Sequence, residues 1–413
     1  MHNLYSPRLI ALRQALPDDP TGVLAAFWSQ MKREGTPLIE PLAGDEIHAL
    51  ATFLWRATGS HDNVMLVCDA VGGTDFPVRP MQRLGNTDLW YLTLKVRRDL
   101  RTIYGFAPDC ALAHERSVEV WDTFWATAGE ERYVLDPLNP RCFNGDGSLL
   151  ELPVALPEPW ARRAPDVPAG ELTHYHVSSG VLSHDFDVWT YTPPGYAMGQ
   201  GGYRWLLLFD GRAYLDAPVT GILDNLVHQG YVPPLVAVFV EHPNRATRQL
   251  ELTGSTRFNR FLTDELLPFL ETHLRLSSNP AHAIIGGSSQ GGLAGAYAAM
   301  HHPNLFGNVL AQGGYFCGAR SGFPTDDPTG YGWLASDVAA IDRLPLRFHL
   351  DVGTLDTFHP YNPAANPLVA VRHLRDVLLA RGYPHSYIEF SGGHDFAGWR
   401  AVFPDALMFL ANG

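Results

Sequence analysis

The chain has 413 residues, 46% of them hydrophobic and 18% charged, and a formal net charge of −13 at pH 7. This length exceeds one ordinary hydrophobic core, which favours two domains in a globular protein. The negative charge argues against nucleic acid as a partner. No uncharged apolar run reaches the length of about 18 residues that a membrane span requires.

The N-terminus lacks a basic segment followed by an apolar one, so we expect no secretory signal. The four cysteines are scattered without C-x-x-C spacing, at Cys68, Cys110, Cys142 and Cys317. This pattern is typical of reduced, mostly buried thiols in a cytoplasmic protein.

The first half of the chain predicts a helical opening, residues 6–32, and then a series of short strands. Apolar, β-prone runs separated by turns such as Gly85-Asn86 occupy residues 49–55, 64–68, 90–96 and 101–106. Regular short strands of this kind favour an immunoglobulin-like β-sandwich over residues 1–150. Residues 151–171 are rich in proline, which withholds backbone donors and keeps a chain extended, so we expect a linker there.

From residue 172 to 413 the pattern changes to alternating strands and helices. The predicted strands are residues 188–191, 205–209, 235–240, 283–285, 309–311, 348–352 and 387–390, and the clearest helices are 257–274, 367–381 and 403–411. This alternation predicts a mainly parallel sheet with helices on both faces, the arrangement of an α/β-hydrolase domain.

His174 and His176 stand two residues apart at the start of this domain and could share one strand face. The neighbouring sequence offers no carboxylate or further histidine, so we predict neither a metal site nor a cofactor there.

The most informative motif is Gly287-x-Ser289-x-Gly291, between an apolar run and a helix rich in alanine and glycine. A sharp turn between a strand and a helix is the setting of a nucleophile elbow, and glycines permit the close packing of that turn. We therefore predict that Ser289 is a nucleophile at a helix N-terminus, where amides favour developing negative charge. The alternative is a glycine-rich turn with an incidental serine.

A serine nucleophile needs a histidine base oriented by a carboxylate. In α/β-hydrolases these follow the serine in the order acid, then histidine, on loops after strands. Asp356 follows the predicted strand 348–352 and His394 follows 387–390, each after a glycine. His359 is the alternative base. We expect Asp351 to lie sideways in its strand, and Asp395 to make local hydrogen bonds.

The predicted oxyanion hole uses the amide of Gln290, directly after the nucleophile. A second amide would come from the loop after strand 205–209, with Arg212 the first candidate and Gly211 the alternative. The competing interpretation is that Asp210-Gly211 is only a turn.

Taken together, these motifs resemble the enterochelin (ferric enterobactin) esterase family over nearly the whole chain. The motifs that carry the resemblance are Gly35-Thr-Pro-Leu-Ile-Glu-Pro41, Thr52-Phe-Leu-Trp-Arg56, residues 81–91, Asp136-Pro-Leu-Asn-Pro140, Arg248-Gln-Leu-Glu-Leu252, Glu265-Leu-Leu-Pro268, the elbow, and Gly392-Gly-His-Asp395 with Trp399-Arg400.

The resemblance implies a β-sandwich ahead of an esterase-D-like hydrolase domain. It also implies hydrolysis of the trilactone esters of a ferric catecholate siderophore, so that iron is released in the cell. Five residues are the implied substrate contacts: Arg245, Arg248, Arg257, Tyr315 and Trp399. For Arg248 the alternative is a structural bridge to Glu251 or Glu265.

The chain departs from the family pattern at Ser288-Ser289-Gln290 and at residues 312–320. We expect both segments to line the pocket, which leaves the particular siderophore open.

Two other functions fit parts of the sequence. A feruloyl or acetyl-xylan esterase could join this hydrolase fold to a sugar-binding sandwich, with Trp90, Trp121 and Trp125 as the stacking platform. A non-catalytic siderophore- or sugar-binding protein could keep the hydrolase frame without its activity.

Overall fold

The computed structural model describes residues 6–71, 77–115, 117–126, 133–143, 147–197, 202–320, 332–358 and 365–413. The chain divides into two compact units. One comprises Met1–Leu156 together with Ser391–Ala397, and the other comprises Pro157–Phe390 together with Gly398–Gly413. No helix in the described part of the chain is both long enough and apolar enough to cross a membrane.

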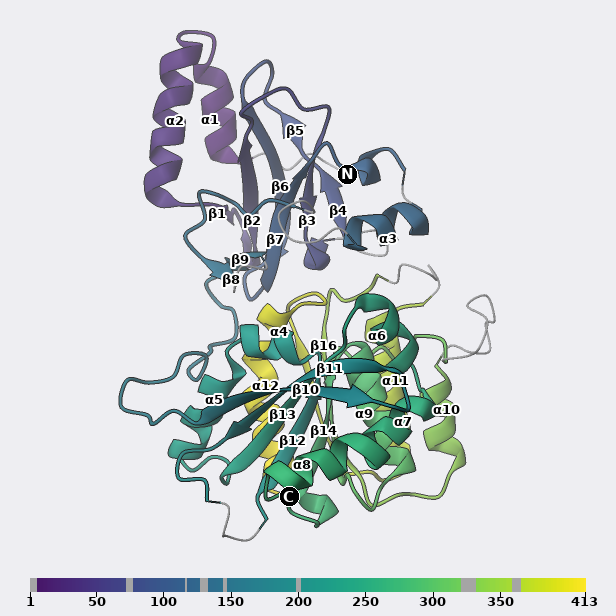
Figure 1. Cartoon of the computed structure of the whole chain (residues 1–413). Helices are drawn as coiled ribbons and strands as arrows, with labels where there is room; N and C mark the ends of the chain where they lie inside the picture. The colour runs from purple at the N-terminus through teal and green to yellow at the C-terminus, as the bar shows by residue number, and fades with distance from the viewer. Residues whose placement is uncertain are drawn as a thin grey trace. The chain divides into compact units, whose positions relative to one another are not determined.

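The first unit opens with two helices and continues in short antiparallel strands (Figure 1). Its elements are α1 (Pro7–Ala15), α2 (Pro20–Glu34), β1 (Leu38–Leu42), β2 (Asp45–Arg56), β3 (Val64–Val67), β4 (Val78–Pro80), β5 (Gln82–Arg83), β6 (Leu89–Arg97), β7 (Arg101–Pro108), α3 (Val118–Ala126), β8 (Cys142–Phe143) and β9 (Gly147–Glu151).

The strands of the first unit form two sheets, in the orders β1-β2-β6-β5 and β4-β3-β7-β9-β8. Aromatic side chains join the sheets, because Phe53 of β2 meets Tyr104 of β7 with ring centroids 4.9 Å apart. Apolar residues of α1 and α2, among them Trp28 and Met31, share a core cluster with Leu54 of β2. The first unit is therefore a β-sandwich, as the sequence predicted, and the predicted helical opening consists of the two helices α1 and α2.

The second unit alternates strands and helices. Its elements are β10 (Glu171–Ser179), β11 (His184–Thr192), β12 (Arg204–Phe209), α4 (Gly211–Asp216), α5 (Val219–His228), β13 (Leu235–Glu241), α6 (Arg245–Glu251), α7 (Thr256–Phe261), α8 (Leu267–His273), β14 (Ala283–Ser288), α9 (Gln290–His301), β15 (Asn308–Gln312), α10 (Trp333–Ala340), β16 (Arg347–Gly353), α11 (Pro367–Ala380), β17 (His385–Phe390) and α12 (Phe396–Ala411).

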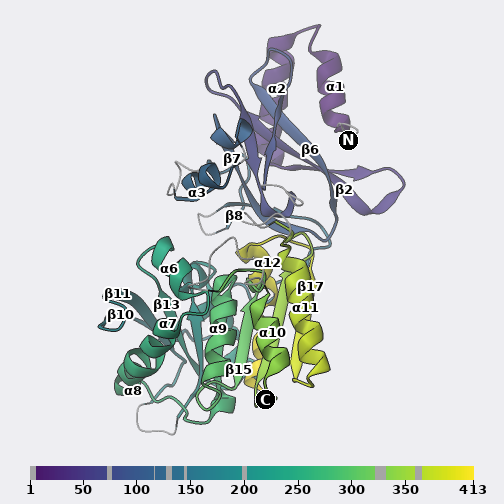
Figure 2. The ribbon, with the colours of Figure 1, turned by 90° about the vertical axis from the view of Figure 1, so that its right-hand side faces the viewer.

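One eight-stranded sheet organises the second unit, in the order β10-β11-β13-β12-β14-β15-β16-β17. The pairs from β13 onward are parallel, whereas β10 and β11 are antiparallel additions at one side. Helices α5 and α12 cover one face, and α9, α10 and α11 lie side by side over the other (Figures 1 and 2). The predicted α/β-hydrolase architecture is confirmed, and the seven predicted strands coincide with β11 to β17.

The strands are central because their residues are apolar without alternation. In β12, β13 and β14 nearly every side chain is buried, the pattern of parallel strands that are covered on both faces. The predicted helix 257–274 is interrupted by a π-helical turn, Leu262–Leu266, between α7 and α8.

The proline-rich segment after β9 bends through a series of hydrogen-bonded turns, so the expectation that it is extended is wrong. Asn225 of α5 donates to the carbonyls of Trp160 and Arg162 and accepts from the amide of Ala164. The Arg400 guanidinium bonds both oxygens of Glu158, at 2.7 and 2.9 Å. Asn225 thus satisfies backbone groups of a segment without helix or strand, and Arg400 fixes it through a side chain.

Candidate active site

Ser289 occupies a strained turn between β14 and α9. Its backbone angles are φ 54° and ψ −119°, a region that a residue with a side chain rarely adopts. The Ser289 amide donates to Gln312 of β15, and the Ser289 carbonyl accepts from the amide of Tyr315 at 2.9 Å. These bonds hold the turn in the geometry of a nucleophile elbow, with Gln290 as the first residue of the helix.

Close packing around the elbow explains its glycines. A Cβ atom on Gly286 would lie 1.8 Å from the carbonyl oxygen of Leu310 in β15. A Cβ atom on Gly295, in α9, would lie 2.5 Å from the Cα atom of Gly286. Strand β14 and helix α9 therefore approach each other at a distance that only glycine allows.

The two aspartates considered as the acid, one within β16 and one after it, have different surroundings. Asp356 is buried in the loop after β16, where its carbonyl accepts from Leu368 at the start of α11. Burial, and then the charge of Asp356, raise the pKa of the nearby Cys317 thiol to about 12. Asp351 is fully buried within β16, accepts from Gln312 Nε2 at 3.0 Å and lies 3.3 Å from His349 Nε2. Asp351 is thus a structural group inside the sheet.

His394 follows β17 and belongs to the segment Ser391–Ala397, which groups with the first unit. Its side chain is half-buried. The next residue, Asp395, accepts from the Ala397 amide at 2.9 Å, a local bond as expected, and also at 2.5 Å from Oγ1 of Thr102, a residue far earlier in the chain. The alternative base, His359, lies outside the described residues.

The turn after β12 carries the second predicted oxyanion donor. Asp210 has φ 59°, and Gly211 begins helix α4. A Cβ atom on Gly211 would lie 2.7 Å from the backbone of Phe239 in β13, so this glycine is needed for packing. The Arg212 amide donates to Glu241 Oε2 at 2.9 Å, which gives this amide a protein partner in the structure.

Glu241 closes the end of β13 beneath that turn. Burial raises its pKa to about 7; the Arg212 amide bond lowers this pKa, and the charge of Asp210 raises it further. The sequence gives no sign of this contact, because nothing in the chain between Arg212 and Glu241 reveals that the two meet.

Arg248 connects the two turns. Its guanidinium bonds both carboxylate oxygens of Asp210, at 2.5 and 2.7 Å, and donates to Gln290 Oε1 at 2.5 Å. Burial alone would lower the pKa of Arg248, but the charge and hydrogen bonds of Asp210 outweigh burial and leave this pKa raised. Arg248 thus forms a structural bridge, which was the alternative to substrate contact. Its partners are Asp210 and Gln290 and not the expected glutamates.

The glutamates expected to pair with Arg248 bind other groups. Glu251 binds His184, with 2.7 Å between the carboxylate oxygen and Nε2. Glu265 accepts from the amides of Gly180 and Val181. Both are therefore occupied by the segment from β10 to β11.

The remaining predicted substrate residues separate into exposed and buried groups. Arg245, the first residue of α6, is exposed, and Arg257 is exposed and donates to the carbonyl of Val181. Tyr315 is half-buried next to the elbow. Trp399 is only 4% exposed, and its indole packs against Gly313. It therefore supports the loop that follows β15.

The expectation that both divergent segments line the pocket is wrong for two of their residues. Ser288 is buried and donates to Asp210 Oδ2 at 3.4 Å. Gln312 is fully buried, accepts from Tyr214, and donates to Asp351 and to the carbonyl of Trp399. Ser288 and Gln312 therefore make hydrogen bonds inside the domain, between the strands next to the elbow and their neighbours.

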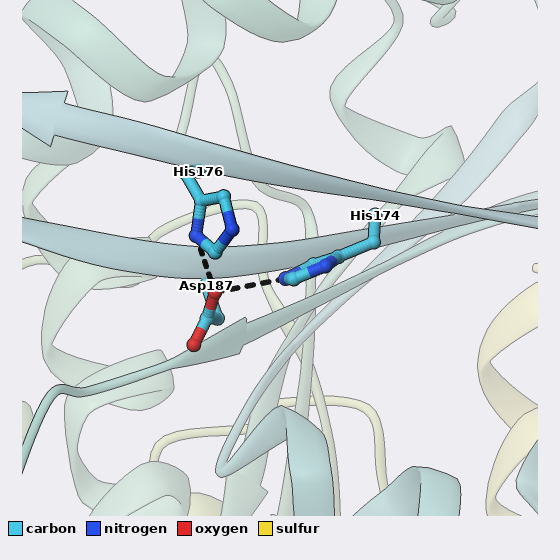
Figure 3. A group of neighbouring side chains, drawn as sticks. All are labelled: His174, His176 and Asp187. Atoms are coloured by element: carbon cyan, nitrogen blue, oxygen red, sulfur yellow. Dashed lines mark hydrogen bonds and ion pairs between the residues drawn. The ribbon is translucent and has the colours of Figure 1, made fainter.

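His174 and His176 have a neighbour that their own strand does not reveal. The pairing of β10 with β11 places Asp187 directly opposite His176. Among the described residues, these three form the one group of histidine, cysteine or acidic side chains able to hold a metal ion (Figure 3).

Two comparisons with family models cover most of the chain. The family described as "Putative esterase" matches residues 179–410, more than half of the sequence. The family described as "Enterochelin esterase, N-terminal" matches residues 50–161. The chain belongs to the enterochelin esterase family. The resemblance predicted from the motifs is thereby confirmed, and the chain is an ester hydrolase.

Individual members of the enterochelin esterase family match nearly end to end. An iron(III) enterobactin esterase of Dickeya dadantii is 28% identical, over 94% of this chain and 93% of its own. The crystal structure of an enterobactin esterase from Shigella flexneri, in the presence of 2,3-dihydroxy-N-benzoyl-serine, superposes with a TM-score of 0.73 at 25% identity, over 92% of this chain and 97% of its own. Ferric enterobactin esterase from Salmonella typhimurium superposes with a TM-score of 0.76 at 24% identity, over 94% and 98%, and supports the fold.

The burial of two tryptophans in the first unit agrees with membership of this family. Trp90 and Trp121 are buried, with 9% and 6% exposure, so they do not form the stacking platform that a sugar-binding sandwich requires. The side chain of Trp125 lies outside the described residues.

Proposed function

We propose that this chain is a serine esterase that hydrolyses the trilactone ester bonds of a ferric catecholate siderophore of the enterobactin type, and so releases its iron in the cytoplasm. The observation that carries the proposal is the strained elbow at Ser289 in a chain whose relatives, matched nearly end to end, are named iron(III) enterobactin esterases.

The order of the strands supports Ser289, Asp356 and His394 as the catalytic triad. Strands β14, β15, β16 and β17 are parallel neighbours, so their carboxyl ends lie at one edge of the sheet. Ser289 directly follows β14, Asp356 comes three residues after β16, and His394 comes four residues after β17. This is the chain order of an α/β-hydrolase triad.

Each member has one task in the proposed reaction. His394 accepts the proton of the Ser289 hydroxyl as its oxygen attacks the ester carbonyl, and the Asp356 carboxylate orients the imidazole and stabilises its positive charge. When the tetrahedral intermediate collapses, His394 gives that proton to the leaving alkoxide. A water molecule then attacks the acyl-enzyme with His394 again as the base, which frees Ser289.

Backbone amides would stabilise the negative oxygen of the intermediate. The Gln290 amide is in the first turn of α9, where amides have no partner within the helix. The second donor is Arg212, with Gly211 the alternative; use of the Arg212 amide requires Glu241 to release it. Arg248 holds both turns and so acts through them, as a positioning residue.

The chemistry of the substrate fits this site. Hydrolysis of the lactone separates catecholate arms that were preorganised around Fe(III), which lowers the affinity of the ligand for iron. A tris-catecholate complex is an anion, and this chain is itself negative, so binding requires local positive charge. Exposed Arg245 and Arg257, with Tyr315 beside the elbow, are the proposed contacts.

The decisive experiment compares substrates and a matched pair of variants. We expect chromatography to show cleavage of ferric enterobactin and no release of ferulate from feruloylated xylan oligomers. Ser289→Ala should lower kcat by at least about 10⁴-fold, because the nucleophile is lost, and should prevent labelling by a fluorophosphonate. Ser288→Ala, next to it but buried, should still be labelled.

Ferulate release without siderophore cleavage would assign the chain to the carbohydrate esterases. Absence of labelling in the wild type, together with tight binding of the uncleaved siderophore, would assign it to the non-catalytic binding proteins.

A further inference from the structure

A cluster of two histidines and an aspartate lies on the outer strand pair of the large sheet and has no role in the proposed hydrolysis. His174 and His176 belong to β10, the outermost strand, and Asp187 belongs to β11. In the antiparallel register His176 is opposite Asp187, and His174 is opposite Trp189. Residues two apart on a strand share a face with the residues opposite them, so all three side chains project from one face.

The nitrogen and oxygen atoms of this cluster converge. Asp187 Oδ1 lies 2.8 Å from His174 Nε2 and 2.7 Å from His176 Nδ1. Figure 3 shows both imidazoles directed at this carboxylate. All three ligand atoms lie within 4.8 Å of one another. Ligand atoms of a tetrahedral Zn²⁺ are roughly 3.4 Å apart, so small side-chain movements suffice to admit a cation.

The fold fixes part of this geometry in advance. The His174 ring stacks on the Trp189 indole, with centroids 4.6 Å apart and an interplanar angle of 10°. Tyr175, between the two histidines, packs against Phe269 and His273. Packing of this residue anchors the strand, so a cation would meet ligands that are already oriented.

We propose that His174, His176 and Asp187 bind one divalent transition-metal cation, with Zn²⁺ the ligand to test first. Two imidazoles and one carboxylate form a donor set that suits zinc and its neighbours better than Mg²⁺ or Ca²⁺. The side chains are 40%, 78% and 43% exposed, which leaves room for water to complete the coordination.

Protons compete with a metal for the same nitrogen atoms. In the alternative interpretation, Asp187 only accepts hydrogen bonds from the two imidazoles. A bound cation would take the place of those hydrogen bonds, and each neutral imidazole would then have its proton on the other ring nitrogen.

The first unit offers a matched control. His48 Nδ1 is 2.9 Å from Asp45 Oδ2, and the ammonium of Lys95 is 2.7 Å from the same oxygen. This histidine–aspartate pair therefore has a positive charge where the proposed site has a second imidazole. It should not bind a metal ion.

Calorimetric titration of the full-length, tag-free, chelator-treated chain with ZnCl₂ at neutral pH tests the proposal. We expect one saturable site whose affinity falls at least about tenfold in each of His174→Ala, His176→Ala and Asp187→Asn, since even outer-sphere changes typically weaken metal binding by that much. His48→Ala should leave the affinity unchanged. With Cu²⁺, electron paramagnetic resonance should detect two nitrogen ligands.

Circular dichroism of each variant establishes that it is folded. The proposal is wrong if the wild type shows no saturable binding at millimolar zinc, or if the three variants bind zinc as well as the wild type does. Neither result would affect the esterase assay, because none of these residues belongs to the proposed catalytic group.

Discussion

Two turns of the second unit share a positive φ but differ in ψ and in the forces that hold them. Ser289, after β14, and Asp210, after β12, both have a positive φ and both precede a helix. Both turns have a glycine packed against the backbone of a neighbouring strand, Gly286 and Gly211. Arg248 reaches both turns, but it bonds the neutral Gln290 side chain at the first and forms an ion pair with the Asp210 carboxylate at the second, so only the second turn depends on two ionised groups.

The largest effect should follow from filling the space behind Ser289. In Gly286→Ala the new methyl group would lie 1.8 Å from the Leu310 carbonyl oxygen, an atom of the neighbouring strand. Because the central sheet cannot move away locally, we expect a loss of at least about 3 kcal/mol in the free energy of unfolding, the upper range for overpacking. Urea denaturation followed by circular dichroism measures it.

Gly59→Ala is the matched control for this substitution. A Cβ atom on Gly59 would meet nothing within 4 Å, so its stability should stay within about 0.5 kcal/mol of the wild type. Equal stability of the two variants would show that β14 and β15 are not packed as tightly as described.

The second effect concerns the charge that holds the Asp210 turn. Arg248→Ala leaves a mostly buried carboxylate without its partner, so we expect a loss of about 3 kcal/mol in the free energy of unfolding. If Arg248 positions the two oxyanion turns, kcat should fall about tenfold or more with little change in KM. If instead it contacts the substrate, KM should rise in proportion.

Two further variants make this test specific. Arg248→Lys keeps the charge but cannot span Asp210 and Gln290 together, so it should restore stability in part and kcat hardly at all. Arg260 pairs with Asp264 at the surface, with both side chains more than half exposed, and Arg260→Ala should change neither quantity measurably.

The contrast between the turns also explains what the sequence could predict. The elbow and the seven strands β11 to β17 were predictable because apolar runs, glycine spacing and chain order are local signals. Arg248 was recognised as important, but its partner Asp210 lies 38 residues earlier, and no pattern joins the two. Long-range ion pairs depend on how strands are ordered in the sheet, and β12 and β13 are adjacent only after crossover connections.

The contacts of His176 and of the proline-rich segment could not be predicted either, because both depend on residues that are brought close by the fold. Asp187 was not recognised as a neighbour of His176, because the register of β10 on β11 places it there. The prolines indicated a segment without helix or strand before β10, but its hydrogen bonds to Asn225 depend on a helix more than 50 residues further along.

The smallest and most specific effect concerns Glu241, which accepts the Arg212 amide at the Asp210 turn. Burial raises the pKa of Glu241 from 4.5 to about 7, so the folded chain binds this proton more tightly than the unfolded chain. The contribution of Glu241 to the free energy of unfolding should therefore be largest below pH 4.5. It should fall between pH 4.5 and 7 and stay level above pH 7. The full change is at most about 3 kcal/mol.

Glu241→Gln removes this titration and keeps an oxygen that can accept from the Arg212 amide. We expect the stability of the variant relative to the wild type to increase as the pH rises from 5 to 8, measured by urea denaturation at each pH. Glu389→Gln is a control of opposite sign, because the hydrogen bonds of Arg372 lower the pKa of Glu389 to about 2. Its effect on stability should be constant over the same range and should disappear only in stronger acid. A flat profile for Glu241→Gln would mean that the turn after β12 is open to solvent, and that charge does not distinguish it from the elbow.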